Sequence, residues 1–360
     1  MKTIVLVGGG HSHLYCIKQL QKNKHPDMKW ILLSSSKLQY YSGMFSGYAE
    51  GLYTEKDISI DLEKLTRNSA ASFIETTVLS IDTHNQKILG SNGEVIDYDV
   101  VSFDIGSINK EPSIEGLSHH NVKIKPNYQF PRQIKPLQQS QNSVVIGGGA
   151  AGIEMALSLL AWRKKQPKKT SVTLIHSSPL LASAGKKASN RITKLAAEHG
   201  LTLVHDRVNK VTESLLSTEN GLEIQYDGLL YLGGPKPPSL LVASKLPTDR
   251  NGFLLVNASL QSVGHRNLFG AGDCITISDH EDTPKNGVNA VRQGPVLFEN
   301  ITNHVLGYPL KTFTPQKYFL AILSTGHQKG FLTYGSFVAY GKWAWHLKDW
   351  IDRRFMGNYQ

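Results

Sequence analysis

Apolar and polar positions along the chain mark strands followed by helices. The β-branched and apolar residues 3–7 predict a buried strand, glycines fill positions 8–10, and residues 12–23 have the spacing of a helix. A second apolar run at 30–33 predicts the next strand. Strand, helix and strand in this order predict a βαβ unit with parallel strands.

The same pattern returns much later in the chain. Residues 143–146 predict a strand, 147–149 a glycine turn, 150–161 a helix and 172–175 the next strand. Two such βαβ units, with glycine turns that begin at positions 8 and 147, indicate two nucleotide-binding domains rather than a short solenoid repeat.

The segments around these units predict connections and smaller strands. The glycine- and tyrosine-rich residues 37–51 predict a long functional loop. Residues 73–105 alternate between apolar and polar positions and predict short antiparallel strands ending in the buried run at 100–103. Residues 107–142 hold four prolines and predict a crossover between domains. The basic run at 163–169 predicts a solvated turn.

Composition restricts the class of protein. Of 360 residues, 40% are hydrophobic and 19% are charged, which is typical of a globular chain of two or three domains and excludes wholesale disorder. The net charge of +10 favours anionic partners such as nucleotides or anionic lipids. No aromatic and basic module accompanies this charge, so we expect no nucleic-acid partner.

Two cysteines, Cys16 and Cys274, stand far apart, so we expect neither dithiol chemistry nor a metal site. So few cysteines are typical of a cytoplasmic protein. The apolar run after Lys2 is too short for a signal peptide, and no stretch approaches the ~20 apolar residues of a membrane-spanning helix. We therefore expect neither an export signal nor a segment that crosses a membrane.

The second glycine loop has the spacing of a dinucleotide site. Gly147 permits a tight turn, Gly149 lets a pyrophosphate approach the backbone, and Gly152 lets helix and strand pack closely. The N-terminus of the following helix then faces the phosphates.

The first loop repeats this spacing with Gly8 and Gly10, but His13 stands where the third glycine would be. We predict a second dinucleotide here. The spacing of His11 and His13 does not favour a metal site, so we expect hydrogen-bonding or packing roles for both.

Neither loop is followed by the acidic residue that usually binds the ribose at the end of the second strand. Ser34 and Ser35 stand there in the first unit, and His176 stands there in the second. Without a carboxylate at the second site, both NADH and NADPH remain open as donors. Three cations nearby in sequence would suit a 2′-phosphate: Lys186, Lys187 and Arg191.

A late Gly-Ala-Gly-Asp sequence at 270–273 completes a pattern that resembles the pyridine nucleotide–disulfide oxidoreductase superfamily over about residues 1–312. The resemblance implies an α/β fold with two Rossmann-like domains, for FAD and NAD(P)H, the second inserted in the first, and a C-terminal α/β tail with an amphipathic helix. The implied plan is 1–110 and 241–312 for FAD, 111–240 for NAD(P)H, and 313–360 for membrane docking or dimerisation.

The resemblance also implies the roles of individual residues. Asp273 would hold the ribityl chain and Glu154 would lie near the nicotinamide, unless it is only a carboxylate in the first turn of its helix. The position of Lys285 beside a predicted helix N-terminus would let it stabilise charge on the reduced flavin, with a solvent-facing loop lysine as the alternative. We take Glu154 and Lys285 as the catalytic residues. The residues implied for FAD are Gly8, Gly10, His11, Ser12, Ser34, Ser35, Tyr41, Gly106, Gly272, Asp273, Gly287 and Val288, and those for NAD(P)H are Gly147, Gly149 and Gly152.

Within the superfamily, the chain most resembles the branch of type II NADH dehydrogenases and sulfide:quinone reductases, and in it the subgroup sometimes fused to selenide, water dikinase. This resemblance is found in four stretches of the sequence, at 8–13, 41–44, 284–288 and 350–356. The redox cysteine pair of the superfamily is absent, which excludes thiol–disulfide turnover and disfavours sulfide oxidation. The glutamines of the quinone-reducing AQxxxQ sequence are also absent around 287–292.

The last predicted helix, at 341–356, is amphipathic. One face would carry the apolar residues Trp343, Leu347, Trp350, Ile351 and Phe355. Tryptophans with nearby basic residues suit a helix lying among lipid headgroups. Packing on the core or on a second subunit, as in a homodimer, remains open.

The function implied is that of an FAD-dependent NAD(P)H dehydrogenase, similar to type II NADH:quinone oxidoreductases. Hydride would pass from the nicotinamide to flavin N5, and electrons would then pass to a quinone, with the enzyme peripheral on the inner face of the cell membrane. Two alternatives stay open: a soluble flavoprotein reductase of another acceptor, and a nucleotide-sensing flavoprotein.

Overall fold

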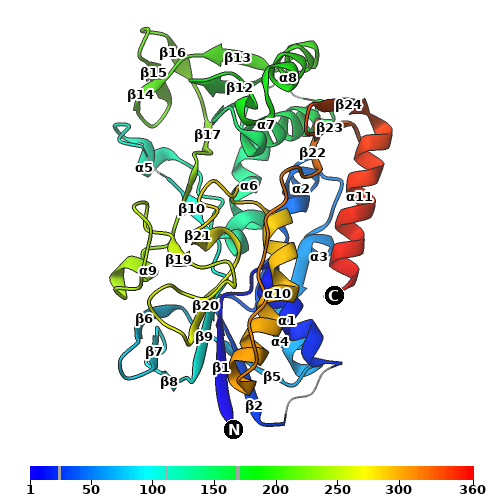
Figure 1. Cartoon of the computed structure of the whole chain (residues 1–360). Coiled ribbons are helices and arrows are strands. Elements are labelled where there is room, and N and C mark those ends of the chain that lie inside the picture. The colour runs from blue at the N-terminus through cyan, green and yellow to red at the C-terminus, as the bar shows by residue number, and fades with distance from the viewer. Residues whose placement is uncertain (23–25, 111, 168–170) are drawn as a thin grey trace.

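The computed structural model describes residues 1–22, 26–110, 112–167 and 171–360, and two parallel sheets organise them (Figure 1). The first sheet has the strand order β20-β9-β1-β2-β5 and the second the order β13-β12-β11-β17. Every neighbouring pair in both sheets runs parallel. Because β20 follows the whole second sheet in sequence, the second unit is inserted in the first. The α/β prediction is therefore confirmed.

The strands have the following bounds. The first sheet contains β1 (Lys2–Val7), β2 (Met28–Ser34), β5 (Ala71–Glu75), β9 (Val100–Phe103) and β20 (Leu268–Gly270), and the second contains β11 (Asn142–Ile146), β12 (Ser171–His176), β13 (Thr202–His205) and β17 (Gly228–Tyr231). Smaller sheets are formed by β3 (Leu38–Tyr40) with β4 (Ser59–Asp61), β10 (Ile108–Asn109) with β18 (Pro235–Lys236), β19 (Leu254–Val256) with β21 (Ile275–Ile277), β14 (Val208–Val211) with β15 (Leu215–Thr218) and β16 (Glu223–Gln225), and β22 (Ala321–Ser324) with β23 (Gly330–Tyr334) and β24 (Phe337–Gly341).

The prediction of antiparallel strands throughout 73–105 was wrong at both ends of that segment. β6 (Val78–Asp82), β7 (Lys87–Gly90) and β8 (Val95–Asp97) are antiparallel. The flanking strands β5 and β9 instead run parallel in the first sheet. All four residues of β9 are buried, which is typical of a strand covered on both faces and distinguishes it from the alternating hairpin before it.

The helices cover the sheets and join the units. Helices α1 and α10 pack together beside the first sheet, and α7 begins at the second glycine loop (Figure 1). The segment 37–51 holds β3 and a short helix in place of an open loop. The helices are α1 (His11–Leu20), α2 (Phe45–Ala49), α3 (Glu55–Ile58), α4 (Leu62–Arg67), α5 (Leu117–His120), α6 (Phe130–Gln139), α7 (Ala150–Arg163), α8 (Lys186–Glu198), α9 (Leu240–Ala243), α10 (Gly287–Leu306) and α11 (Lys342–Gly357).

The last helix, α11, runs along one side of the molecule beside α2 and α3 (Figure 1). Its buried residues are Ala344, Trp345, Asp352 and Met356. The predicted apolar face points largely the other way, since Trp343 is 53% exposed, Trp350 57% and Ile351 37%. Among the helices of the described residues, none combines the length and the apolar character needed to span a bilayer.

The basic run at 163–169 does not lie wholly in solvent. Lys164 and Lys165 are exposed, and residues 168 and 169 lie outside the described residues. Arg163, however, is buried and donates hydrogen bonds to the Leu137 carbonyl at 3.0 Å and the Ser140 hydroxyl at 2.6 Å. Its guanidinium therefore joins the end of α7 to the end of α6, which the solvated-turn interpretation missed.

We expect Arg163→Met to lower the free energy of unfolding by about 3 kcal/mol, because buried carbonyl and hydroxyl acceptors lose a charged donor. Urea unfolding followed by circular dichroism measures this. Lys164→Met, on the exposed side of the same turn, is the matched control and should change stability by less than about 0.5 kcal/mol. Equal stability of both variants would show that the Arg163 contacts contribute nothing.

Candidate functional site

The first glycine loop turns tightly over the end of β9. Gly8 has a φ of +94°, and a Cβ there would lie 2.4 Å from the Asp104 carbonyl oxygen, so only glycine fits. The carboxylate of Asp104 accepts the N–H of Ser12 at 2.8 Å. The Ser12 hydroxyl donates to the Ala290 carbonyl at 2.6 Å, which ties the loop to α10.

His13, which replaces the third glycine, points into the interior. Its Nδ1 lies 2.7 Å from the Gly8 carbonyl and its Nε2 lies 2.9 Å from the Ser102 hydroxyl. Burial lowers the pKa of this imidazole to about 4, so it is neutral at pH 7. The side chain that replaces glycine thus stabilises the loop from below, in the packing and hydrogen-bonding role expected from the sequence.

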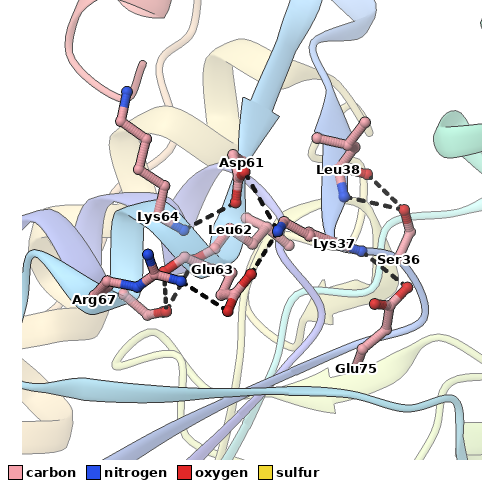
Figure 2. A network of polar contacts seen from close by, with 10 residues as sticks. Ser36, Lys37, Leu38, Asp61, Leu62, Glu63, Lys64, Arg67 and Glu75 are labelled. Atoms are coloured by element: carbon pink, nitrogen blue, oxygen red, sulfur yellow. Dashed lines mark hydrogen bonds and ion pairs between the residues drawn. The ribbon is translucent and has the colours of Figure 1, made fainter.

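Residues 36–38, which follow β2, are held by a network of hydrogen bonds and ion pairs to residues 61–67 and Glu75 (Figure 2). Ser34 lies opposite Glu75 in the parallel register of β2 and β5, and Glu75 accepts the N–H of Lys37 at 3.3 Å. The Lys37 ammonium pairs with Glu63 at 2.5 Å. Ser35 is exposed beside this network. Glu75 therefore brings a carboxylate to the position where the sequence showed only serines.

The late glycine motif lies next to the first loop. Gly272 has a φ of +73°, and its N–H donates to the Gln293 side chain at 2.7 Å. Asp273 accepts a hydrogen bond from Ser107 at 3.5 Å, and Ser107 accepts one from Lys125 at 3.1 Å. Burial raises the pKa of Asp273 and lowers that of Lys125. No motif in the sequence marked Lys125, which reaches this site from the predicted crossover segment.

The N-terminus of α10 faces the first loop. Asn286 caps it by accepting the N–H of Asn289 at 3.0 Å. The N–H groups of Gly287 and Val288 have no acceptor in the described part of the chain. A Cβ on Gly287 would lie 3.8 Å from Nε2 of His11, so the two predicted cofactor residues lie close together.

Lys285, predicted to be catalytic, is engaged with the neighbouring strand. Its ammonium donates to the carbonyl of Ile275 and, at 3.0 Å, to the hydroxyl of Thr276. It also lies 4.6 Å from the ring centroid of Phe253. Burial lowers its pKa. Gly106, the other residue predicted after β9, has a φ of +66° and open space around it.

The second glycine loop leaves its helix N-terminus open. A Cβ on Gly152 would lie 1.9 Å from the Gly147 carbonyl oxygen, which explains the third glycine here. A Cβ on Gly149 would meet nothing within 4 Å. Between residues 148 and 152, the backbone N–H groups have no acceptor in the described part of the chain. This loop has both the space and the donors for a pyrophosphate.

His176 ends β12 directly beside this loop. Its Nδ1 lies 2.8 Å from the Ser178 carbonyl, which can only accept, so Nδ1 carries the proton. The ring stacks on His205 with centroids 4.9 Å apart, and both rings line a hollow with Ser189 and Lys194 of α8.

The three cations named for a 2′-phosphate lie on α8. Lys186 and Lys187 are exposed at the start of α8, whereas Arg191 donates to the Val338 carbonyl.

Glu154 of α7 links the second loop to the C-terminal segment. One carboxylate oxygen accepts the N–H of Ser324 at 2.7 Å and the hydroxyl of Ser46 at 3.3 Å. Burial raises the pKa of Glu154, and the positive charge of Lys348 opposes that rise.

A buried ion pair fixes α11 against the rest of the site. The Lys348 ammonium lies 2.6 Å from Asp352 and also donates to the Gly43 carbonyl. Asp352 accepts the phenolic hydroxyl of Tyr41 at 2.9 Å. Burial alone would lower the pKa of Lys348, but Asp352 and Glu154 outweigh it and raise that pKa.

Aromatic contacts extend this cluster to the first loop. The Tyr41 ring stacks on Phe355 at 4.5 Å, and the His11 ring lies 5.5 Å from Tyr41 and 5.2 Å from Phe355. Burial lowers the pKa of His11 to about 4. A continuous set of side chains therefore joins the first glycine loop, through Tyr41, to Lys348 and Glu154. Neither motif spacing nor helical periodicity indicated that Lys348 and Asp352 belong to this set of side chains.

Known proteins show the same organisation. The family described as pyridine nucleotide-disulphide oxidoreductase matches residues 2–294. Ferroptosis suppressor protein 1 of Homo sapiens is 27% identical over 345 residues, covering 91% of this chain and 87% of that protein. The sulfide-quinone reductase of Aquifex aeolicus is 24% identical, covering 99% of this chain and 90% of that protein.

Solved structures agree on the fold. The sulfide:quinone oxidoreductase of Aquifex aeolicus has a TM-score of 0.82 at 23% identity and covers 99% of this chain and 91% of its own. NDH2 of Plasmodium falciparum in complex with NADH has a TM-score of 0.82 at 12% identity and covers 99% of this chain and 97% of its own.

We expect Lys348→Met to lower the free energy of unfolding by about 3 kcal/mol, because it leaves Asp352 and Glu154 buried without their cation. Urea unfolding measures the change. In the double variant Lys348→Met/Asp352→Leu the part of this loss that comes from Asp352 should return, since an apolar pair replaces that ion pair, while Glu154 still lacks its cation. Lys342→Met, exposed on the same helix, is the control. A single variant as stable as the wild type would contradict the role of the pair.

Proposed function

Because the chain belongs to the pyridine nucleotide-disulphide oxidoreductase family, we propose that it is an FAD-dependent NAD(P)H dehydrogenase that reduces a quinone. The overall reaction consumes NAD(P)H, a proton and the quinone, and yields NAD(P)⁺ and the hydroquinone. FAD and a nicotinamide dinucleotide are the cofactors. FAD, when bound, supplies the acceptance of hydride and the onward transfer of electrons.

The residues of the chain fit both groups. The open N–H groups of residues 148–152 suit the pyrophosphate of NAD(P)H, and the free N–H groups of Gly287 and Val288 suit the negative charge that develops on a reduced flavin. Gly8, Gly10, Ser12 and Asp273 surround the proposed FAD site. Beside Ser34 and Ser35, Glu75 adds a carboxylate for the ribose of FAD.

The observation that supports a quinone acceptor is a buried group of three hydrogen-bonded side chains, Tyr41, Asp352 and Lys348. A quinone takes up two protons with two electrons, so its site needs groups that hold protons. Here the Tyr41 hydroxyl and the Lys348 ammonium both donate to one carboxylate, between the two glycine loops. Glu154, with a raised pKa, adjoins this group and is proposed to orient the nicotinamide.

The cysteines support NAD(P)H rather than sulfide as the electron donor. Cys16 and Cys274 are both free and buried. Burial raises the pKa of both thiols, that of Cys274 to about 12, so neither forms the thiolate that sulfur chemistry needs. The relatives named for quinone reduction support the acceptor, while the donor proposed here follows from the second glycine loop.

We propose further that the outer face of α11 docks on the anionic inner surface of the cell membrane. Trp343, Trp350 and Ile351 are exposed on this face. The Arg354 guanidinium lies 5.3 Å from the ring centroid of Trp350, so a cation accompanies the apolar surface. Tryptophan beside arginine is the combination that suits the headgroup layer.

Under anaerobic conditions, we expect NADH or NADPH to bleach the visible flavin absorbance of the purified protein, and a short-chain quinone to restore it. Stopped-flow absorbance measures both steps. Gly149→Asp places a carboxylate before the open N-terminus of α7, so this variant should keep its flavin but lose bleaching. Bleaching that no quinone reverses would contradict the proposed acceptor.

We expect the triple variant Trp343→Ala/Trp350→Ala/Ile351→Ala to bind vesicles containing anionic lipid about tenfold more weakly or worse, since it loses apolar area. Vesicle sedimentation measures binding, and flavin bleaching in solution should be unchanged. Tyr308→Ala, an exposed aromatic outside α11, is the control. Unchanged vesicle binding would contradict docking, and a change from dimer to monomer in light scattering would assign the face to a second copy.

A further inference from the structure

The N-terminus of α1 already holds a carboxyl group of the chain itself. Asp104 follows β9 directly and is 3% exposed. Its Oδ2 accepts the N–H of Ser12 at 2.8 Å and that of His13 at 3.3 Å. A Cβ on Gly10 would lie 2.1 Å from its Oδ1, and one on Gly272 would lie 2.3 Å from the same atom. The carboxyl thus fills the space between the two glycine motifs of the proposed FAD site.

The second domain provides an internal comparison. The pairing of β1 with β9 matches that of β11 with β17, so Asp104 corresponds to Leu232. A Cβ on Gly8 would lie 2.4 Å from the Asp104 carbonyl oxygen, and one on Gly147 would lie 2.3 Å from that of Leu232. The backbones therefore agree, but only the first loop has a carboxyl at its helix N-terminus.

This difference affects how each loop would bind the pyrophosphate of its dinucleotide. A helix N-terminus after a glycine loop binds pyrophosphate through its N–H groups and its dipole. At α7 those groups are open, whereas at α1 Asp104 takes two of them. An ionised Asp104 beside the pyrophosphate of FAD would place like charges together in a buried site.

The surroundings of Asp104 favour its neutral form. Burial, reinforced by Asp273, raises its pKa to about 7, although the N–H groups of Ser12 and His13 oppose this. The other titratable groups nearby are the imidazoles of His11 and His13, with their pKa lowered to about 4, and the thiols of Cys16 and Cys274, with theirs raised.

We propose that Asp104 takes up a proton when FAD binds, so that the affinity for FAD falls as the pH rises. In the FAD-free protein above the pKa of Asp104, the ionised carboxylate caps α1 and keeps the first loop formed. With FAD bound, the protonated carboxyl leaves the helix N-terminus to the pyrophosphate. The inference rests on the FAD-dependent function proposed above.

Titration of the FAD-free protein with FAD, followed by flavin fluorescence, tests this from about pH 5.5 to about pH 8.5. The dissociation constant should be level below the pKa of Asp104 and rise about tenfold per pH unit above it. Calorimetry at about pH 8 in two buffers of different ionisation enthalpy should show uptake of about one proton per FAD.

Asp104→Asn keeps the size of the side chain and removes its titration. This variant should bind FAD with one affinity at every pH, about tenfold tighter than the wild type at about pH 8. Asp104→Leu, which copies Leu232, should also lose the pH dependence. Asp99→Asn is the control, because Asp99 accepts the N–H of Thr3 at 2.8 Å at the opposite end of β9 and should leave the wild-type slope intact.

If the dissociation constant for FAD rises with pH in both Asp104 variants as it does in the wild type, or if FAD binds without proton uptake, the role of Asp104 is wrong. Neither result would contradict the proposed dehydrogenase function. A wild-type protein that binds no FAD at any pH would overturn both. Wild-type proton uptake needs no variant, so misfolding of a variant does not remove the test.

Discussion

The buried ammonium of Lys348 is the contact on which the arrangement of the site depends. It joins Asp352 of its own helix to the Gly43 carbonyl near the first unit, and it lies within electrostatic reach of Glu154 in the second. A buried charge is unfavourable unless it is paired and hydrogen-bonded. In the observed position of α11 these requirements are met, so the ion pair favours this seating of the C-terminal segment on the two units.

The same contact determines what α11 shows to its surroundings. Since Lys348 and Asp352 must face inward, the tryptophans at 343 and 350 are turned away from the core. The inner face of the helix therefore adds one ion pair to the buried residues Ala344, Trp345 and Met356, while Trp343 and Trp350 lie on the outer face among charged residues. Exposed tryptophans of this kind are the basis for the docking proposed above.

The sequence was sufficient to predict the positions at which the backbone must adopt a conformation that only glycine tolerates. Gly8, Gly147 and Gly272 adopt left-handed φ values, and residues of this kind have a recognisable spacing. It was insufficient wherever the outcome depends on side chains that meet only in the folded chain. Helical periodicity identified the apolar stripe of α11 but not its direction, because Gly43 and Glu154, which meet Lys348 in addition to Asp352, come from distant segments. Arg163 was assigned to solvent for the same reason.

The two glycine loops show how one backbone serves two purposes. In both, the strand opposite the loop presents a carbonyl to the first glycine, so the turn itself is the same. The residue that supplies that carbonyl differs: Asp104 at one loop and Leu232 at the other. A carboxyl beneath the first loop accepts N–H groups at the start of α1, whereas the N–H groups at the start of α7 are left open for the proposed nucleotide. This suits a resident cofactor at the first site and a substrate that must enter and leave at the second.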